Sequence, residues 1–297
     1  MQPRDPRLLI WTAAIFATFA VLIVLGSIAA RRRIDGIWRI FGIQALTTVW
    51  ILGAAWAGGW WFVLALAATA VAASYEVTGT IAKLGPAPWR LGVAIASAGY
   101  CIAAAIPGAW SPGVVLAFAL VLFFQPVFGG PLEGAYLRGA ASLMASFYPG
   151  LCLAFGVRLA GLGNALGDFA YLYAVLEIND ACASLTGRLF GRRPYAPVLS
   201  PRKTREGSAG GIVGAVVAGA LLSFLLPGLG PPFGALLGLL LGVFGQAADL
   251  AASAIKRQAG VKDFAATIPT QGGVLDVYDS LIFCLPPWCL LLQLWRA

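Results

Sequence analysis

The chain has 297 residues, of which 60% are hydrophobic and only 11% are charged, and its formal net charge is +8. Soluble globular proteins carry about 25% charged residues, so the composition excludes that class and indicates an integral membrane protein. The sequence contains no histidine, which excludes histidine general bases and histidine-ligated metals. Any chemistry must therefore use carboxylates, cations, hydroxyls and backbone amides.

Apolar runs bounded by Gly, Pro and Arg predict an all-α fold, because helices satisfy their own backbone groups in lipid. We expect ten membrane spans, at 8–30, 41–57, 59–78, 91–108, 112–128, 139–160, 166–187, 209–228, 232–255 and 279–295. The first run exceeds the roughly 20 residues that a spanning helix needs, so it is predicted to be a retained helix. Residues 1–40 are thus expected to form an extra helix with a basic loop, and residues 41–297 a single membrane domain.

The cations follow the same alternation of spans and loops. With both termini outside, most of the 20 Lys and Arg residues fall in loops on one side, which the positive-inside rule assigns to the cytoplasm. The five cysteines are odd in number and scattered through apolar runs, so they are predicted to be packing residues rather than disulfide partners or zinc ligands.

The carboxylates of the predicted spans, Glu76, Glu177, Asp180 and Asp249, are candidate functional residues, because a charge at the centre of a spanning helix costs about 2.5 to 3.5 kcal/mol. Asp180 shares a helix face with Ser184 and Arg188, and Asp249 shares one with Lys256. The alternatives are structural: polar contacts between helices at Asp180 and an internal ion pair at Asp249.

Glu76 lies near a predicted helix end, and so does a further acid, Asp168. For these a structural role is favoured, Glu76 meeting the membrane interface and Asp168 starting a helix.

The loop at 191–211 carries five cations against Glu206 and leads into a Gly-rich helix start. Lys and Arg bind phosphate through charge-assisted hydrogen bonds, and helix N-termini add amide donors. A loop that only contacts anionic lipid is the alternative. Nucleic acid is not an expected partner, because the loop has no aromatic platform.

The segment "SAIKRQAGVKDFAATIPTQGGVLDVYDS", 253–280, combines cations, a glycine pair and carboxylates. Asp276 and Asp279 lie three residues apart at a predicted helix start, where the helix dipole alone favours them by about 0.3 to 1 kcal/mol. Such a pair also suits Mg²⁺, which is held by one or two carboxylates with waters and substrate phosphates. Gly272 and Gly273 allow the backbone to approach an anion closely.

The segment resembles the C-terminal signature of the phosphatidate cytidylyltransferase (CDP-diacylglycerol synthase) family. The positions that carry the resemblance are Ser253, Lys256, Arg257, Lys262, Asp263, Ala265, Ile268, Pro269, Gly272, Gly273, Asp276 and Asp279. Upstream, "DACASLTGRLFG" and "SPRKTREGSAGG" are similar to two further family segments, so the motif-bearing part is about 177–280. The chain departs from the signature at Gln271, Val277, Ala181 and Ser184, where the family has His, Arg, Thr and Tyr.

The resemblance implies transfer of a cytidylyl group from CTP to phosphatidate, giving CDP-diacylglycerol and pyrophosphate, with Mg²⁺ as cofactor. The implied metal ligands are Asp276, Asp279, Asp249 and Asp180, and the implied catalytic groups are Asp276, Asp279, Asp249, Lys256 and Lys262. The implied phosphate-binding groups are Lys203, Arg205 and Arg257, with Ser200, Thr204, Gly272 and Gly273 as minor donors.

Membrane lipid, a bacterial inner-membrane location with a cytoplasmic site, and a homodimer are implied as well. Two alternatives stay open: a related lipid-phosphate nucleotidyltransferase with another lipid or nucleotide, and a membrane transporter or lipid-binding protein whose intramembrane acids relay protons or bind cations.

Overall fold

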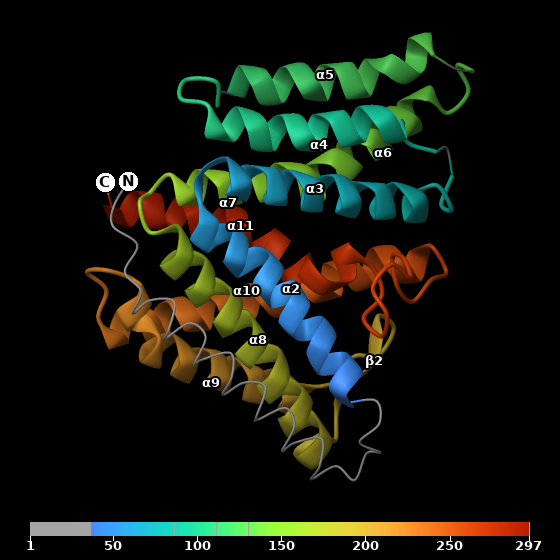
Figure 1. Ribbon diagram of the computed structural model, residues 1–297. Coiled ribbons are helices and arrows are strands. Elements are labelled where there is room, and N and C mark those ends of the chain that lie inside the picture. The colour runs from blue at the N-terminus through green and yellow to red at the C-terminus, as the bar shows by residue number, and fades with distance from the viewer. Residues whose placement is uncertain (1–36, 86, 111, 130, 297) are drawn as a thin grey trace. The chain divides into compact units, whose positions relative to one another are not determined.

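The computed structural model describes residues 37–296 except 86, 111 and 130 (Figure 1). The predicted span 8–30 lies outside the described residues. The described chain forms two compact units, one made of residues 37–56 and 163–251 and the other of residues 57–162 and 252–296.

The first unit contains four helices and a small hairpin. Its elements are α2 (Ile37–Ala57), α8 (Ala165–Phe190), β1 (Pro194–Ala196), β2 (Ser200–Thr204), α9 (Arg205–Leu221), the 3₁₀ turn η3 (Ser223–Leu225) and most of α10 (Pro231–Gln258). Small residues let α9 and α10 approach closely, since a Cβ at Gly219 would overlap the carbonyl oxygen of Gly234. The hydroxyl of Tyr171 on α8 donates to the same Gly234 oxygen at 2.7 Å. These contacts hold α8, α9 and α10 together around the carbonyl oxygen of Gly234.

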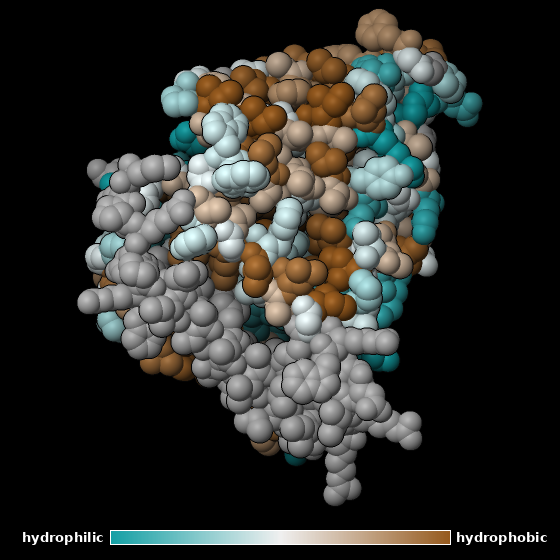
Figure 2. Space-filling view, in the orientation of Figure 1, coloured by the Kyte–Doolittle hydropathy of each residue, from teal (hydrophilic) through white to brown (hydrophobic). Residues whose placement is uncertain are grey.

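Within the described residues, the named elements of the second unit are all helical, and the loop before its last helix adds an isolated β-bridge between Ile268 and Gly272. The unit contains α3 (Gly59–Ile81), α4 (Arg90–Ala105), α5 (Pro112–Phe128), α6 (Ala135–Ser146), the π-helical turn η2 (Phe147–Leu151), α7 (Cys152–Ala160), the end of α10 and α11 (Val274–Arg296). In this unit α4 lies between α3 and α5 (Figure 1). Figure 2 shows apolar side chains spread over the outer surface of these three helices, as expected for a surface that contacts lipid.

The π-helical turn joins α6 and α7 into one continuous helix, Ala135–Ala160. Pro149 lies within this turn and has no backbone N–H to donate, which removes one regular helical bond. Gly150 beside it packs tightly on α4, because a Cβ there would come 2.6 Å from the Cβ of Ser97. The irregular turn is therefore fixed by helix packing.

The helical membrane class is supported, but the prediction of ten spans is not confirmed. Among the described residues, four helices are long and apolar enough to cross a membrane: α3, the continuous helix Ala135–Ala160, α10 and α11. Shorter apolar helices lie at Gly42–Ala57, α4 and α5. Asp168, Glu177 and Asp180 make α8 more polar, and α9 has only 17 residues.

The loop expected at 191–211 instead contains the β1–β2 hairpin and the first turns of α9. The prediction that Asp168 starts a helix is confirmed, because this residue lies in the first turn of α8.

Candidate active site

A pocket of about 540 Å³ lies in the first unit, and we call it the hairpin pocket. Its charged and amide side chains come from α8 (Asp180, Arg188), the hairpin (Arg202, Lys203) and α10 (Gln246, Asp249). The volume lies within the range of about 300 to 1,000 Å³ that is usual for small-molecule sites. Cations and carboxylates converge here from segments almost 70 residues apart.

The hairpin fixes the position of the basic side chains. Strands β1 and β2 pair in antiparallel fashion, with Pro194 opposite Thr204 and Ala196 opposite Ser200. Thr204 then caps α9, because its hydroxyl oxygen accepts a hydrogen bond from the backbone N–H of Gly207 at 3.1 Å. Lys203 therefore lies within β2, one residue before the cap of α9, which restricts the backbone that carries it.

Glu206 in the first turn of α9 ties the start of the hairpin to the helix. Its Oε2 accepts hydrogen bonds from the backbone N–H groups of Arg192 at 3.1 Å and Arg193 at 3.2 Å. The bond from Arg192, with that from Arg193, lowers the pKa of the Glu206 carboxyl below its usual value. The one acid of the predicted basic loop thus has a structural role.

Lys203 and Asp249 form an ion pair across the hairpin pocket. The exposed fractions of the two side chains are 38% and 25%, so solvent reaches both partners. The sequence-based alternative of an ion pair for Asp249 is confirmed, although the partner comes from β2 and not from its own helix. This pair is open enough for another cation to compete with the lysine amine.

Asp180 lines the same pocket and is held by its neighbour in the chain. The side-chain amide of Asn179 donates to Oδ1 of Asp180 at 3.1 Å. Two of the four predicted metal ligands, Asp180 and Asp249, therefore lie in one pocket together with Lys203 and Ser200.

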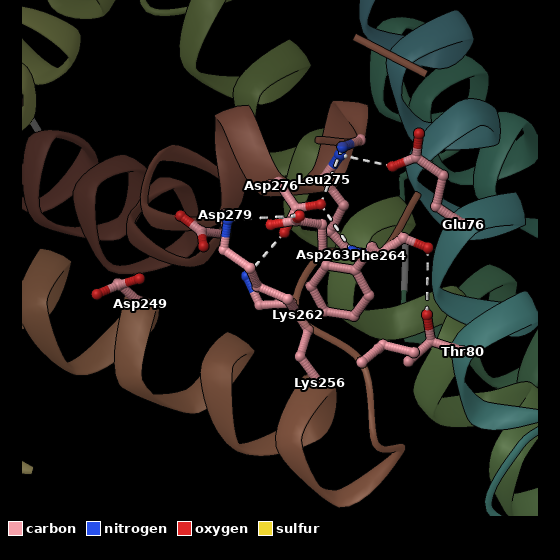
Figure 3. A network of polar contacts seen from close by, with 12 residues as sticks. Glu76, Thr80, Asp249, Lys256, Lys262, Asp263, Phe264, Leu275, Asp276 and Asp279 are labelled. Carbon is pink, nitrogen blue, oxygen red and sulfur yellow. Dashed lines mark hydrogen bonds and ion pairs between the residues drawn. The ribbon is translucent and has the colours of Figure 1, made fainter. Parts of the chain in front are cut away.

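A second polar cluster lies in the second unit, around Asp276 (Figure 3). Oδ1 of Asp276 accepts a hydrogen bond from Nζ of Lys256 at 2.7 Å, and the side chains of this ion pair are only 4% and 11% exposed. Oδ2 accepts from the backbone N–H groups of Phe264 at 2.7 Å and Gly273 at 2.9 Å. Asp276 thus joins the end of α10, the following loop and the start of α11.

Glu76 from α3 caps α11 from a distant part of the sequence (Figure 3). Its Oε1 accepts from the hydroxyl of Thr267 at 2.7 Å and the backbone N–H of Val274 at 2.9 Å. Its Oε2 accepts from the backbone N–H of Leu275 at 2.8 Å. Glu76 is 7% exposed, so this acid is a buried cap rather than a group at the membrane interface.

The glycine pair is required by these carboxylates. A Cβ on Gly273 would overlap the carboxylate of Glu76, and one on Gly272 would lie 2.8 Å from Oδ2 of Asp276. Gly272 also has φ of +100°, which favours glycine. The anions that approach this backbone in the structure are the protein's own carboxylates, and binding of a substrate phosphate there stays a prediction.

Three other predicted site residues have local partners in the second unit. Lys262 lies 3.9 Å from Asp263 in an exposed pair, and Nη1 of Arg257 donates to the carbonyl oxygen of Val261 at 3.1 Å. Oδ1 of Asp279 accepts from the backbone N–H of Ser280 at 2.6 Å.

The remaining prediction, Arg205, begins α9 and donates its backbone N–H to Arg193 at 2.9 Å. The phosphate-binding roles of these side chains stay predictions.

The hairpin pocket offers a donor set that fits Mg²⁺. Among the residues that the structure describes, no three acidic or cysteine side chains lie close enough to hold a metal ion by themselves. Mg²⁺ needs fewer, since one or two carboxylates with substrate phosphates and waters usually suffice. Asp180 and Asp249 meet that requirement, whereas both oxygens of Asp276 are already engaged by donors.

Sequence reasoning identified Asp180, Lys203 and Asp249 but missed Gln246 and Ser208. Gln246 lies one helical turn before Asp249 in an otherwise apolar stretch of α10, and both side chains line the hairpin pocket. A polar amide at that spacing from an intramembrane acid was the available signal. Ser208 carried no comparable signal in a glycine-rich helix start.

Comparison with known proteins gives the class of the chain. Residues 36–295 match the cytidylyltransferase family. The match covers most of the sequence, so the chain belongs to this family.

Named relatives agree with that assignment. The chain is 34% identical over 153 residues to the phosphatidate cytidylyltransferase of Staphylococcus haemolyticus, and 38% identical over 145 residues to that of Bacillus subtilis. These matches cover 51% and 48% of this chain and 58% and 54% of the relatives, so the chain spans little more than half of their length. The phosphatidate cytidylyltransferase of Staphylococcus aureus strain COL is 31% identical over 201 residues, 59% of this chain and 76% of the relative.

Proposed function

We propose that this protein transfers a cytidylyl group from CTP to phosphatidate, giving CDP-diacylglycerol and pyrophosphate. The observation that carries the proposal is the hairpin pocket, in which Lys203 and two arginines meet Asp180 and Asp249. Membership of the cytidylyltransferase family and the names of the relatives support the same reaction.

In the proposed reaction, a phosphate oxygen of phosphatidate attacks the α-phosphorus of CTP. The bond from that phosphorus to the bridging oxygen breaks, and pyrophosphate leaves with the electron pair. The attacking phosphate is already anionic near neutral pH, so a site without histidine needs no strong base. Its task is to hold two polyanions together and offset their repulsion, which is positioning and electrostatic stabilisation.

Lys203, Arg188 and Arg202 line the hairpin pocket and would bind the phosphate groups. Asp180 and Asp249 would hold Mg²⁺, with Lys203 balancing the charge of Asp249 before substrate binds. Bound Mg²⁺ would neutralise phosphate oxygens and help to align the reacting groups. We propose further roles for Asp276, Asp279, Lys256 and Lys262 from the resemblance, with Lys256 held on Asp276.

We also propose that the protein lies in the bacterial inner membrane with ten spans and the hairpin pocket facing the cytoplasm. The apolar helices and the bacterial relatives support a membrane location, and the density of cations at 188–205 supports this orientation. A homodimer is a further proposal from the resemblance.

The test measures pyrophosphate release from CTP by purified protein in detergent, with phosphatidate micelles and Mg²⁺. We expect release that requires both substrates, a loss of at least about 100-fold in Asp249→Asn and Asp276→Asn, and no loss in Glu133→Gln, an exposed acid. No release from folded protein with any lipid phosphate or nucleotide would contradict the proposal.

Gln271 and Val277 replace a histidine and an arginine of the family signature, which favours testing a second substrate set. A related nucleotidyltransferase would release pyrophosphate with an isoprenoid phosphate, an ether lipid or another nucleotide. The same assay with these substrates separates the two reactions.

A further inference from the structure

A chain of buried amides lies beside the hairpin pocket and ends at Asp180. It starts at Ser208 on α9, continues through Gln246 on α10 and Asn179 on α8, and reaches the Asp180 carboxylate. Gln246 is 8% exposed and Asn179 is 1% exposed. Of these residues, only Asp180 has a role in the proposed reaction.

Hydrogen bonds connect each side chain of this network to the next. Nε2 of Gln246 donates to the backbone carbonyl oxygen of Ser208 at 2.9 Å and to Oδ1 of Asn179 at 3.1 Å. The hydroxyl of Ser208 donates to Oε1 of Gln246. Nδ2 of Asn179 then donates to Oδ1 of Asp180 at 3.1 Å.

The orientation of both amides in this network follows from the backbone carbonyl of Ser208. A backbone carbonyl can only accept, so Gln246 must turn its NH₂ group toward Ser208. The same NH₂ group faces Asn179, which must therefore present its oxygen to Gln246 and its own NH₂ group to Asp180. Asp180 consequently receives a donor on Oδ1, as an ionised carboxylate requires.

Close packing restricts the space around the central amide. A Cβ on Gly211 of α9 would lie 2.9 Å from Oδ1 of Asn179, and one on Gly242 of α10 would lie 3.5 Å from the same atom. The two glycines thus bring both neighbouring helices against the amide oxygen. Asn179 is held by shape as well as by its hydrogen bonds.

We propose that Gln246 is a positioning residue that acts through Asn179 to hold the Asp180 carboxylate with one oxygen directed to a divalent cation in the hairpin pocket. No described residue donates a hydrogen bond to the other oxygen, Oδ2 of Asp180. The inference rests on the proposed function only in taking Asp180 as a metal ligand. At metal sites, residues that hydrogen-bond to a metal ligand orient that ligand, and their loss costs about 10- to 100-fold in metal affinity. The proposal assigns this role to Gln246 and Asn179.

The competing explanation is that the amides only join α8, α9 and α10, as polar side chains often do between membrane helices. Both explanations predict lower thermal stability when Gln246 is replaced. They differ in the affinity for a divalent cation, which a purely structural contact leaves unchanged in folded protein.

The experiment measures Mn²⁺ binding to the purified protein by electron paramagnetic resonance, without substrates. The variants are Gln246→Met, which keeps the length of the side chain but removes its amide, Asp180→Asn, and their combination. Gln293→Met near the end of α11 is the matched control. Asn179→Ala removes the middle link and serves if Gln246→Met does not fold.

We expect the Mn²⁺ dissociation constant to rise about tenfold in Gln246→Met and in Asn179→Ala, and to stay unchanged in Gln293→Met. In the combined variant we expect no loss beyond that of Asp180→Asn alone, because both changes act through one carboxylate. A lower melting temperature with unchanged Mn²⁺ affinity would overturn the proposal.

Unchanged Mn²⁺ binding in Asp180→Asn would overturn it too, whether or not the enzyme releases pyrophosphate. Conversely, weakened Mn²⁺ binding in Gln246→Met together with an absence of pyrophosphate release would support the positioning role and contradict the proposed reaction.

Discussion

At the scale of single residues, two of the four predicted metal ligands are paired with lysines in different surroundings. Asp249 meets Lys203 in a pair that solvent reaches, whereas Asp276 meets Lys256 in a pair that is almost fully buried. An exposed ion pair contributes about 0 to 1 kcal/mol. Removing one partner of a buried pair costs about 3 to 5 kcal/mol, because the other charge stays buried without compensation.

The two lysines should therefore respond differently to substitution. We expect Lys256→Met to lower the free energy of unfolding by about 3 kcal/mol and Lys203→Met by less than about 1 kcal/mol. Thermal unfolding of both variants in the same detergent measures the difference. Equal destabilisation would contradict a structural role for Lys256 in holding Asp276.

At the scale of elements, Glu76 joins α3 to the start of α11. It accepts the backbone N–H groups of Val274 and Leu275, which have no partner within their own helix. A glutamine at this position has one acceptor oxygen, and its NH₂ group would face a backbone donor. Leaving a buried donor unsatisfied costs about 1 to 3 kcal/mol.

We therefore expect Glu76→Gln to destabilise the protein by about 1 to 3 kcal/mol, and Glu133→Gln, a change of the same kind at an exposed acid, to have little effect. Hydrogen exchange at the first turns of α11 should rise in Glu76→Gln and stay unchanged in Glu133→Gln. Unaltered exchange in Glu76→Gln would show that another group caps this helix.

The same contacts explain which elements the sequence could predict. Apolar runs located the helices, because burial and lipid contact both leave a local hydrophobic signal. The helices extend beyond the predicted spans: α11 begins at Val274, ahead of the span predicted at 279–295, and its capping carboxylate comes from a residue almost 200 positions earlier. Likewise α9 begins at Arg205, ahead of the span predicted at 209–228, because Thr204 caps it within a hairpin that was expected to be a loop.

In the site too, local sequence patterns predicted some residues and missed others. Asp180 and Asp249 stood out because charges are rare in apolar helices, and Lys203 because it lies in a dense basic loop. Gln246 was missed because its importance depends on three hydrogen bonds to two residues, Ser208 and Asn179, which lie on two other helices. No pattern within α10 alone specifies such partners.

At the scale of the whole molecule, the distribution of charge predicts how the protein crosses the membrane. Within the first unit, the hairpin precedes α9 and the turn around Pro227 follows it, so the two connections lie at opposite ends of that helix. The hairpin end carries the dense group of cations, whereas residues 222–231 carry no charged side chain. The positive-inside rule therefore assigns the hairpin to the cytoplasm and the Pro227 turn to the other side.

A single cysteine at each end tests this orientation, because Val198 is 84% exposed and Pro227 is also exposed. We expect a membrane-impermeant maleimide to label Pro227→Cys in intact cells and Val198→Cys in inverted vesicles. The unaltered chain controls for its five native cysteines, of which Cys101, Cys284 and Cys289 are buried. Labelling of Val198→Cys in intact cells would place the hairpin pocket on the face away from cytoplasmic CTP, and the proposed reaction would then lack its nucleotide.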